Sequence, residues 1–227
     1  MTYAGQAVTF RYVIPANPRR VSLPLMVELH GVQQKYADGF MGLSLGTPRG
    51  YIVLDAGGDG LGSWNAGKCC GPAAASGQDS VGMVAAMMNE LHHAHAFDTH
   101  RAYAAGFSNG GMLAYRMACE RPTLFAAIAV VAGAYVNDCV PQHPVALMAV
   151  HGTADTSVPF LGGRNAWLGV TFPSAAASVL TMARVDAGYA TATLVPLDGD
   201  GHIWPTLLRG GYATSWQVEG FLLSRRN

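Results

Sequence analysis

The residues Gly106 to Gly110 form a G-x-S-x-G motif between an apolar run and a stretch with helical spacing. This motif is typical of a sharp strand-to-helix turn that presents a serine, here Ser108, as a nucleophile. Glycine is needed on both sides of the serine because side chains there would collide with the neighbouring strand and helix. The first N–H groups of the following helix would face the oxyanion that forms when the serine attacks a carbonyl. Ser108 is therefore the candidate nucleophile.

A serine hydroxyl stays protonated at neutral pH and needs a base to activate it. The chain order that accompanies this turn is Ser, then Asp or Glu, then His, which singles out Asp155 and His202. Each follows an apolar run, so both are predicted to lie at the same sheet edge as Ser108. His202 would take the serine proton and return it to the leaving group. Asp155 would hold the imidazole tautomer and stabilise the imidazolium.

Other residues compete for these two roles. Asp198 and Asp200 are rival acids, but they lie so close to His202 in the chain that a loop role fits them better. His30 and His151 are rival bases, and each precedes a glycine at a predicted strand end. An imidazole in that position commonly supports the loop by hydrogen bonding, so both are interpreted as structural.

The oxyanion of an acyl-transfer reaction needs two hydrogen-bond donors. The backbone N–H of Asn109 follows the nucleophile directly, and the N–H of Val32 comes from the loop after the apolar run 25–29. Gly31 would let that loop approach the serine closely. These two N–H groups are the predicted oxyanion hole.

A metal site is not predicted, although four histidines gather in one region: His92, His93, His95 and His100. No carboxylate or cysteine at matching spacing completes a set of ligands. We expect neither a metal nor another cofactor, and a serine triad needs none.

The elements that must position these residues alternate along the chain. Strands are predicted at 8–14, 25–29, 51–54, 102–105, 127–131, 145–150 and 193–195, the first with one buried face. Helical spacing covers 80–93, 110–120, 174–187 and 212–224. The later apolar runs suit strands that are covered on both faces. The pattern predicts one α/β domain over residues 1–227, with a mostly parallel sheet and helices on both faces.

Composition narrows the possible partners. Half of the 227 residues are apolar and 12% are charged, with 14 Lys+Arg balancing 14 Asp+Glu. The chain therefore has no excess of basic residues, which a nucleic-acid-binding protein or a protein bound to anionic lipid would need. No run reaches the length of a membrane span. We therefore expect a soluble globular protein without nucleic-acid or membrane partners.

Compartment and cysteine pairing stay open. The N-terminal residues show no signal peptide, but an exported protein with its signal removed would look the same. The protein would then be secreted, and otherwise cytoplasmic. The cysteines are an adjacent pair, Cys69 and Cys70, and two single residues, Cys119 and Cys139. Four thiols allow three pairings, among which spacing cannot choose.

The motifs in these loops, taken together, resemble those of the esterase family of polyhydroxybutyrate depolymerase-like and feruloyl esterase-like α/β-hydrolases. The resemblance rests on Leu29-His30-Gly31, Ser63-Trp64-Asn65-Ala66-Gly67 with the following Cys69-Cys70, the motif at 106–111, His151 to Asp155, and Gly201 to Pro205. It implies an α/β-hydrolase fold, Ser108, Asp155 and His202 as the triad, and hydrolysis of carboxylic esters. It also implies that Trp64 and Trp204 wall the substrate cleft.

The size of the substrate is predicted from the length of chain that could form a lid over the cleft, and this length is small. Only the stretch 156–173 could form a modest flap, so no large cap domain is expected, and Trp167 in this stretch is a further candidate for the cleft wall. Such a cleft suits short-chain or aromatic, feruloyl-like esters, or hydroxyalkanoate oligomers. Two alternatives remain: a peptidase or amidase using the same triad, and a binding protein that keeps the fold without turnover.

The chain also departs from the resemblance. The segment 40–49 is a short substitute for the helix expected before the strand at 51–54. Near Ala187-Gly188 many relatives are expected to carry a cysteine, and this chain has none. Disulfide pairing is therefore not transferred from the family.

Overall fold

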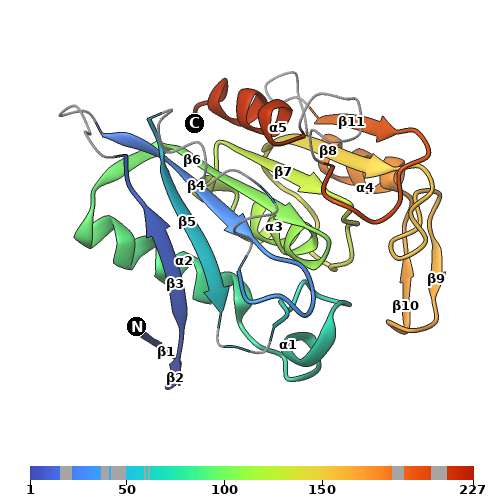
Figure 1. The fold of residues 1–227 in the computed structure, drawn as a ribbon, viewed down its shortest axis with the longest axis horizontal. Coiled ribbons are helices and arrows are strands. Elements are labelled where there is room, and N and C mark those ends of the chain that lie inside the picture. Colours follow the sequence, from blue (N-terminus) through green and yellow to red (C-terminus); the bar gives the residue numbers. More distant parts are fainter. Residues whose placement is uncertain are drawn as a thin grey trace.

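The computed structural model describes residues 1–15, 22–36, 41, 50–58, 60, 62–185, 192–205 and 214–227. It shows a central sheet with helices on both of its faces (Figure 1). The expected segments at 40–49, apart from Met41, and at 187–188 lie outside the described residues.

The central sheet, as far as the described residues show it, has seven strands in the order β11-β8-β7-β6-β4-β5-β3. The bounds are β3 Thr9–Val13, β4 Leu23–Leu29, β5 Ile52–Gly58, β6 Phe97–Phe107, β7 Ala127–Val131, β8 Ala146–Gly152 and β11 Ala192–Leu197. Only β3 runs antiparallel to its neighbour, so the predicted mostly parallel sheet is confirmed. The carboxyl ends of β4, β6, β8 and β11 consequently share one edge of the sheet.

The helices cover the two faces of this sheet through separate apolar cores. Their bounds are α1 Gly71–Ala75, α2 Ser80–Ala94, α3 Asn109–Glu120, α4 Ala175–Ala183 and α5 Thr214–Leu223, with a 3₁₀ turn at Pro122–Leu124. α2, α3 and α4 pack on the face that carries Leu25, Val27 and Leu29. α5 packs on the opposite face, against Met26 and Tyr103. Successive strand residues point to opposite faces, and this places Met26 and Val27 in different cores.

The described helices include none that is long and apolar enough to cross a membrane.

Two small hairpins were not predicted. β1 Thr2–Tyr3 pairs with β2 Gln6–Ala7, and β9 Gly163–Asn165 pairs with β10 Val170–Phe172. These strands are too short to show a period-2 pattern. The β9–β10 hairpin projects from the end of the molecule near β11 (Figure 1).

Three element predictions need correction. The first predicted strand is the edge strand β3: Val8, Phe10 and Ile14 pack against the core as predicted, but Tyr12 on the same face is 45% exposed. β6 begins at Phe97 rather than Ala102, because its exposed first half lacks the apolar run that identified the second half. α4 ends at Ala183 rather than Ala187.

Candidate active site

Ser108 occupies the turn between β6 and α3. Its backbone has φ 54° and ψ −119°, a conformation that L-residues seldom adopt. A Cβ at Gly106 would collide with the backbone of Gly110, and a Cβ at Gly110 would collide with the backbone of Leu29. The two glycines of the motif are therefore what allows α3 to start directly against β4 and β6. This packing holds the Ser108 turn at the carboxyl edge of the sheet.

The structure brings the three predicted side chains of the triad together. Ser108 Oγ lies 2.9 Å from His202 Nε2, and His202 Nδ1 lies 2.7 Å from Asp155 Oδ2. The three residues come from loops after β6, β8 and β11. They are separated by 94 and 47 positions in the chain, and the shared edge of the parallel sheet brings them into contact.

Asp155 is buried, and its two oxygens have well-defined donors. Oδ1 accepts from the backbone N–H groups of Ser157 at 2.8 Å and Val158 at 2.9 Å. Oδ2 faces His202 and also lies 3.3 Å from His151 Nε2. Burial alone raises the pKa of the Asp155 carboxyl, but hydrogen bonds from His151 and His202 outweigh it, and the pKa lies well below its ordinary value.

The rival residues have other partners. His151 is buried, and its Nε2 lies 2.8 Å from the carbonyl oxygen of Val158. The N–H of the same Val158 donates to Asp155, so His151 lies beside that carboxylate. His30 Nδ1 lies 2.7 Å from the carbonyl oxygen of Gly31, and burial lowers the His30 pKa. Asp198 accepts a 3.2 Å hydrogen bond from the Thr153 hydroxyl. Sequence reasoning treated His151 only as a loop support and missed its contact with the acid.

The predicted oxyanion donors lie beside the nucleophile. A Cβ at Gly31 would lie 3.5 Å from the Ser108 Cβ, which shows how closely the loop after β4 approaches the serine. Val32 lines the same cavity as Ser108. The N–H of Asn109 belongs to the first residue of α3 and has no intrahelical acceptor. Among the described residues, neither of these two N–H groups has a protein acceptor.

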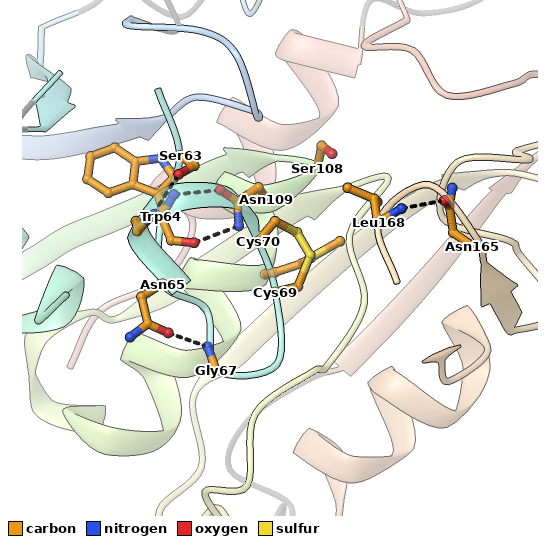
Figure 2. The surroundings of a disulfide bond; sticks show 12 residues. Ser63, Trp64, Asn65, Gly67, Cys69, Cys70, Ser108, Asn109, Asn165 and Leu168 are labelled. Carbon is orange, nitrogen blue, oxygen red and sulfur yellow. Dashed lines mark hydrogen bonds between the residues drawn. A yellow bond between two sulfur atoms is a disulfide. The ribbon is translucent and has the colours of Figure 1, made fainter. Parts of the chain in front are cut away.

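Trp64 does not wall the cleft, and that expectation is corrected. Its side chain is fully buried, and its Nε1–H donates to the carbonyl of His30 at 3.0 Å. The Asn109 side chain holds the Trp64 backbone by two hydrogen bonds, accepting from N–H at 2.6 Å and donating to the carbonyl at 2.9 Å (Figure 2). Trp64 thus ties the loop after β4 to the start of α3, the two segments that carry the predicted oxyanion donors.

Trp204 also lies outside the cavity wall. It is 6% exposed, packs in the core beneath α5, and donates from Nε1 to the Ser215 hydroxyl at 3.1 Å. Ser215 donates in turn to the carbonyl of Met41. Trp204 therefore anchors the loop that carries His202 to α5.

Replacing Trp64 by Phe tests this structural assignment. The change keeps the aromatic packing but leaves the buried His30 carbonyl without its indole donor, so we expect the free energy of unfolding to fall by about 1–3 kcal/mol. KM for small esters should stay unchanged because the indole does not reach the cavity. Urea unfolding and steady-state kinetics measure the two quantities, with Trp216→Phe, at a tryptophan that is 53% exposed, as the matched control. A raised KM without loss of stability would contradict this assignment and indicate that Trp64 contacts the substrate.

A cavity of about 190 Å³ opens beside Ser108 and His202. Its other walls come from the loop after β4, from α3, and from the β9–β10 hairpin, whose residues Asn165, Trp167 and Leu168 line it. Trp167 is 75% exposed, so of the three predicted tryptophans only this one contributes to the wall. Asn165 fixes the hairpin tip by donating to the Ser157 carbonyl and accepting from the Leu168 N–H, both at 2.9 Å.

The cysteines form two disulfides, which the sequence left open. Cys69 is bonded to its neighbour Cys70, and Cys119 at the end of α3 is bonded to Cys139. Cys70 also lines the cavity beside Ser108. The described residues contain no group of three or more His, Cys, Asp or Glu side chains that could hold a metal ion, the four histidines at 92–100 included.

The sheet order, with the strand-to-helix turn at Ser108 on the edge where the loops after β6, β8 and β11 meet, gives this chain the α/β-hydrolase fold. Native pOPH has the same fold, with a TM-score of 0.69 at 16% identity, and the likeness covers 100% of this chain and 86% of that one.

Within this class, the sequence is similar to proteins named as esterases. It is 34% identical over 98 residues to a probable feruloyl esterase C of Aspergillus flavus, which covers 43% of this chain and 36% of that protein. It is 39% identical over 85 residues to the putative esterase NocK of Nocardia uniformis subsp. tsuyamanensis, covering 36% and 25%. The chain thus spans about a third or less of the length of these curated relatives. No family model matches it.

Proposed function

We propose that this protein is a serine hydrolase of carboxylic esters that works through an acyl-enzyme. The observation that carries the proposal is the hydrogen-bonded series Ser108–His202–Asp155, of which Ser108 and His202 line a cavity. The names of the relatives over the matched residues support an ester as the substrate.

In the proposed reaction, Ser108 Oγ attacks the ester carbonyl while its proton passes to His202 Nε2. The N–H groups of Val32 and Asn109 stabilise the negative oxygen of the tetrahedral intermediate. When the C–O bond to the alcohol breaks, the imidazolium returns the proton to the leaving oxygen. Water then attacks the acyl-enzyme, giving its proton to His202, and the acid leaves as Ser108 regains its proton.

Asp155 supports both steps without changing its own protonation. With its oxygen on His202 Nδ1, the ring carries its neutral-state proton on Nδ1, and Nε2 is free to accept from Ser108. The lowered pKa of Asp155 keeps a negative charge beside the imidazolium that forms during the reaction.

The cavity supports a short-chain or single-ring acyl group, or a small hydroxyalkanoate unit. At about 190 Å³ it is smaller than the roughly 300 Å³ and above of sites for drug-sized ligands. It is comparable to an engineered protein cavity of about 150 Å³ that binds benzene. Trp167 at its rim offers a face against which an aromatic ring could pack.

A fluorophosphonate probe tests the proposed function directly. The expected result is one covalent adduct per chain, mapped by peptide mass spectrometry to the peptide that contains Ser108, together with hydrolysis of 4-nitrophenyl acetate or butyrate. The absence of both in folded protein would refute the proposal and favour a binding role. Labelling with cleavage of matched anilides but not esters would favour an amidase.

A further inference from the structure

The disulfide between the adjacent residues Cys69 and Cys70 forms part of the wall around the proposed nucleophile. Cys69 is 1% exposed and Cys70 is 4% exposed, and Cys70 lines the cavity together with Ser108 and Leu168. Figure 2 shows the sulfur pair between the Asn109 side of the site and Leu168 of the β9–β10 hairpin. The disulfide thus contributes Cys70 to the lining of the cavity and Cys69 to the loop behind it.

The chemistry of this wall is apolar. Two bonded sulfurs carry no S–H donor, and the Met112 Sδ lies 3.9 Å from the Cys70 Sγ. Val158 and Leu168 extend the same lining. Among the described residues that line the cavity there is no Asp, Glu, Lys or Arg. A neutral, apolar group gains contact area against the sulfurs, Met112, Val158 and Leu168, whereas a charged group on this side would lie against apolar side chains; the polar residues of the lining are Gln33, Gln34, Ser108, Ser157, Asn165 and His202.

Backbone hydrogen bonds place the disulfide on the oxyanion side of the site. The Cys70 N–H donates to the Trp64 carbonyl at 3.2 Å, and the same carbonyl accepts from the Asn109 side chain at 2.9 Å. Asn109 carries one of the proposed oxyanion donors, while the departing alcohol must take its proton from His202. With the alcohol portion toward His202, the wall tied to Asn109 suits the acyl portion of the ester.

We propose that the Cys69–Cys70 disulfide, with Met112 behind it, is the specificity-determining wall that selects neutral acyl groups about the size of one aromatic ring. The inference rests on the proposed esterase function and adds to it the part of the substrate that this wall recognises.

The loop has anchors besides the disulfide, so the bond can be removed without removing the loop. Asn65 donates from its backbone N–H to the Ser80 hydroxyl and accepts at its carbonyl from Arg116. The Lys68 N–H donates to the Val136 carbonyl at 2.8 Å. Because these contacts do not depend on sulfur, we expect a double serine variant to fold.

The test compares acyl selectivity in Cys69→Ser/Cys70→Ser with that in the wild type. The readout is kcat/KM for 4-nitrophenyl benzoate divided by kcat/KM for 4-nitrophenyl acetate, because both esters share one leaving group and acetate barely reaches the wall. Two hydroxyls in an apolar wall should lower this ratio about 10-fold or more. Cys69→Ala/Cys70→Ala, which stays apolar, should lower it less.

The second disulfide supplies the matched control. Cys119→Ser/Cys139→Ser removes a bond outside the cavity and should leave the ratio unchanged. Met112→Gln is similar in size but polar, so it should also lower the ratio. It replaces the double serine variant as the test if that variant does not fold.

Three results would overturn the inference while the proposed function stands. The first is an unchanged ratio in the folded double serine variant. The second is an equal loss with both esters, which would mean that the disulfide acts only by holding Asn109. The third is altered selectivity across a series of acetate esters with different alcohols, which would place the wall on the leaving-group side. A wild type that hydrolyses no ester and takes no phosphonate would instead refute the proposed function itself.

Discussion

Ser108→Ala is expected to lower kcat for ester hydrolysis by about 10⁴- to 10⁶-fold, the largest effect of any single substitution in this chain. Without Oγ there is no atom to form the acyl-enzyme, and His202 has no hydroxyl to deprotonate. The oxyanion donors and the cavity remain, so a small residual rate above that in water is expected. The position already has a positive φ with a non-glycine residue, so alanine should be accommodated there about as well as serine.

Initial rates with 4-nitrophenyl butyrate, with the reaction in buffer subtracted, measure this effect. Circular dichroism and the thermal midpoint establish that the variant is folded. Ser224→Ala, at an exposed serine after α5, is the matched control and should retain wild-type turnover. If Ser108→Ala retained the activity of this control, another residue would be the nucleophile.

Asp155→Asn should lower kcat by about 10⁴-fold, nearly as much as loss of the nucleophile. The amide oxygen would keep the N–H groups of Ser157 and Val158, because they donate to Oδ1 in the wild type. The NH₂ group would then face His202 Nδ1 and favour the tautomer with its proton on Nε2. That tautomer cannot accept the proton of Ser108.

The rival acid provides the control for this substitution. Asp198→Asn makes the same chemical change at an exposed residue in the loop after β11, and it should leave kcat unchanged. Phosphonate labelling should slow in parallel with ester turnover in Asp155→Asn. A larger loss in Asp198→Asn than in Asp155→Asn would reverse the assignment of the acid.

The lowered pKa of Asp155 also fixes the direction of its contribution to stability. The carboxyl binds its proton less readily in the folded state than in the unfolded chain, so ionised Asp155 contributes stability above the ordinary carboxyl pKa of about 4. That contribution is lost as the pH falls through the lower folded pKa. Asp155→Asn should therefore show a weaker loss of stability with acid than the wild type, measured as the urea midpoint across the acidic range.

The contact between Ser108, His202 and Asp155 could be predicted because parallel strands make chain order informative. In a parallel sheet the loops after β6, β8 and β11 must leave at one edge, so residues 94 and 47 positions apart are candidates for contact before any coordinates are known. The G-x-S-x-G spacing adds the steric requirement at Gly106 and Gly110, which is local and readable from residue type. Contact between His151 and Asp155 could have been suspected from their separation of four positions, but loop conformation decides it.

The roles of Trp64 and Trp204 could not be predicted in the same way. A tryptophan in a glycine-rich loop near a site can face the cavity or the core, and both orientations bury aromatic area. The deciding factors are the polar partners of the indole N–H groups, the His30 carbonyl for Trp64 and the Ser215 hydroxyl for Trp204. Both partners are distant in the chain.

By itself the sequence determined the sheet class, the strand and helix alternation, and the three residues proposed for the triad, because periodicity, glycine sterics and strand direction are local or topological properties. Only the tertiary structure decided the cysteine pairing, the burial of two tryptophans, and the hairpin form of the segment that carries Trp167. Those features depend on side-chain contacts between loops, and loop sequences have no periodic pattern from which such contacts could be predicted. The contacts follow from packing of the whole chain rather than from the spacing of residues along it.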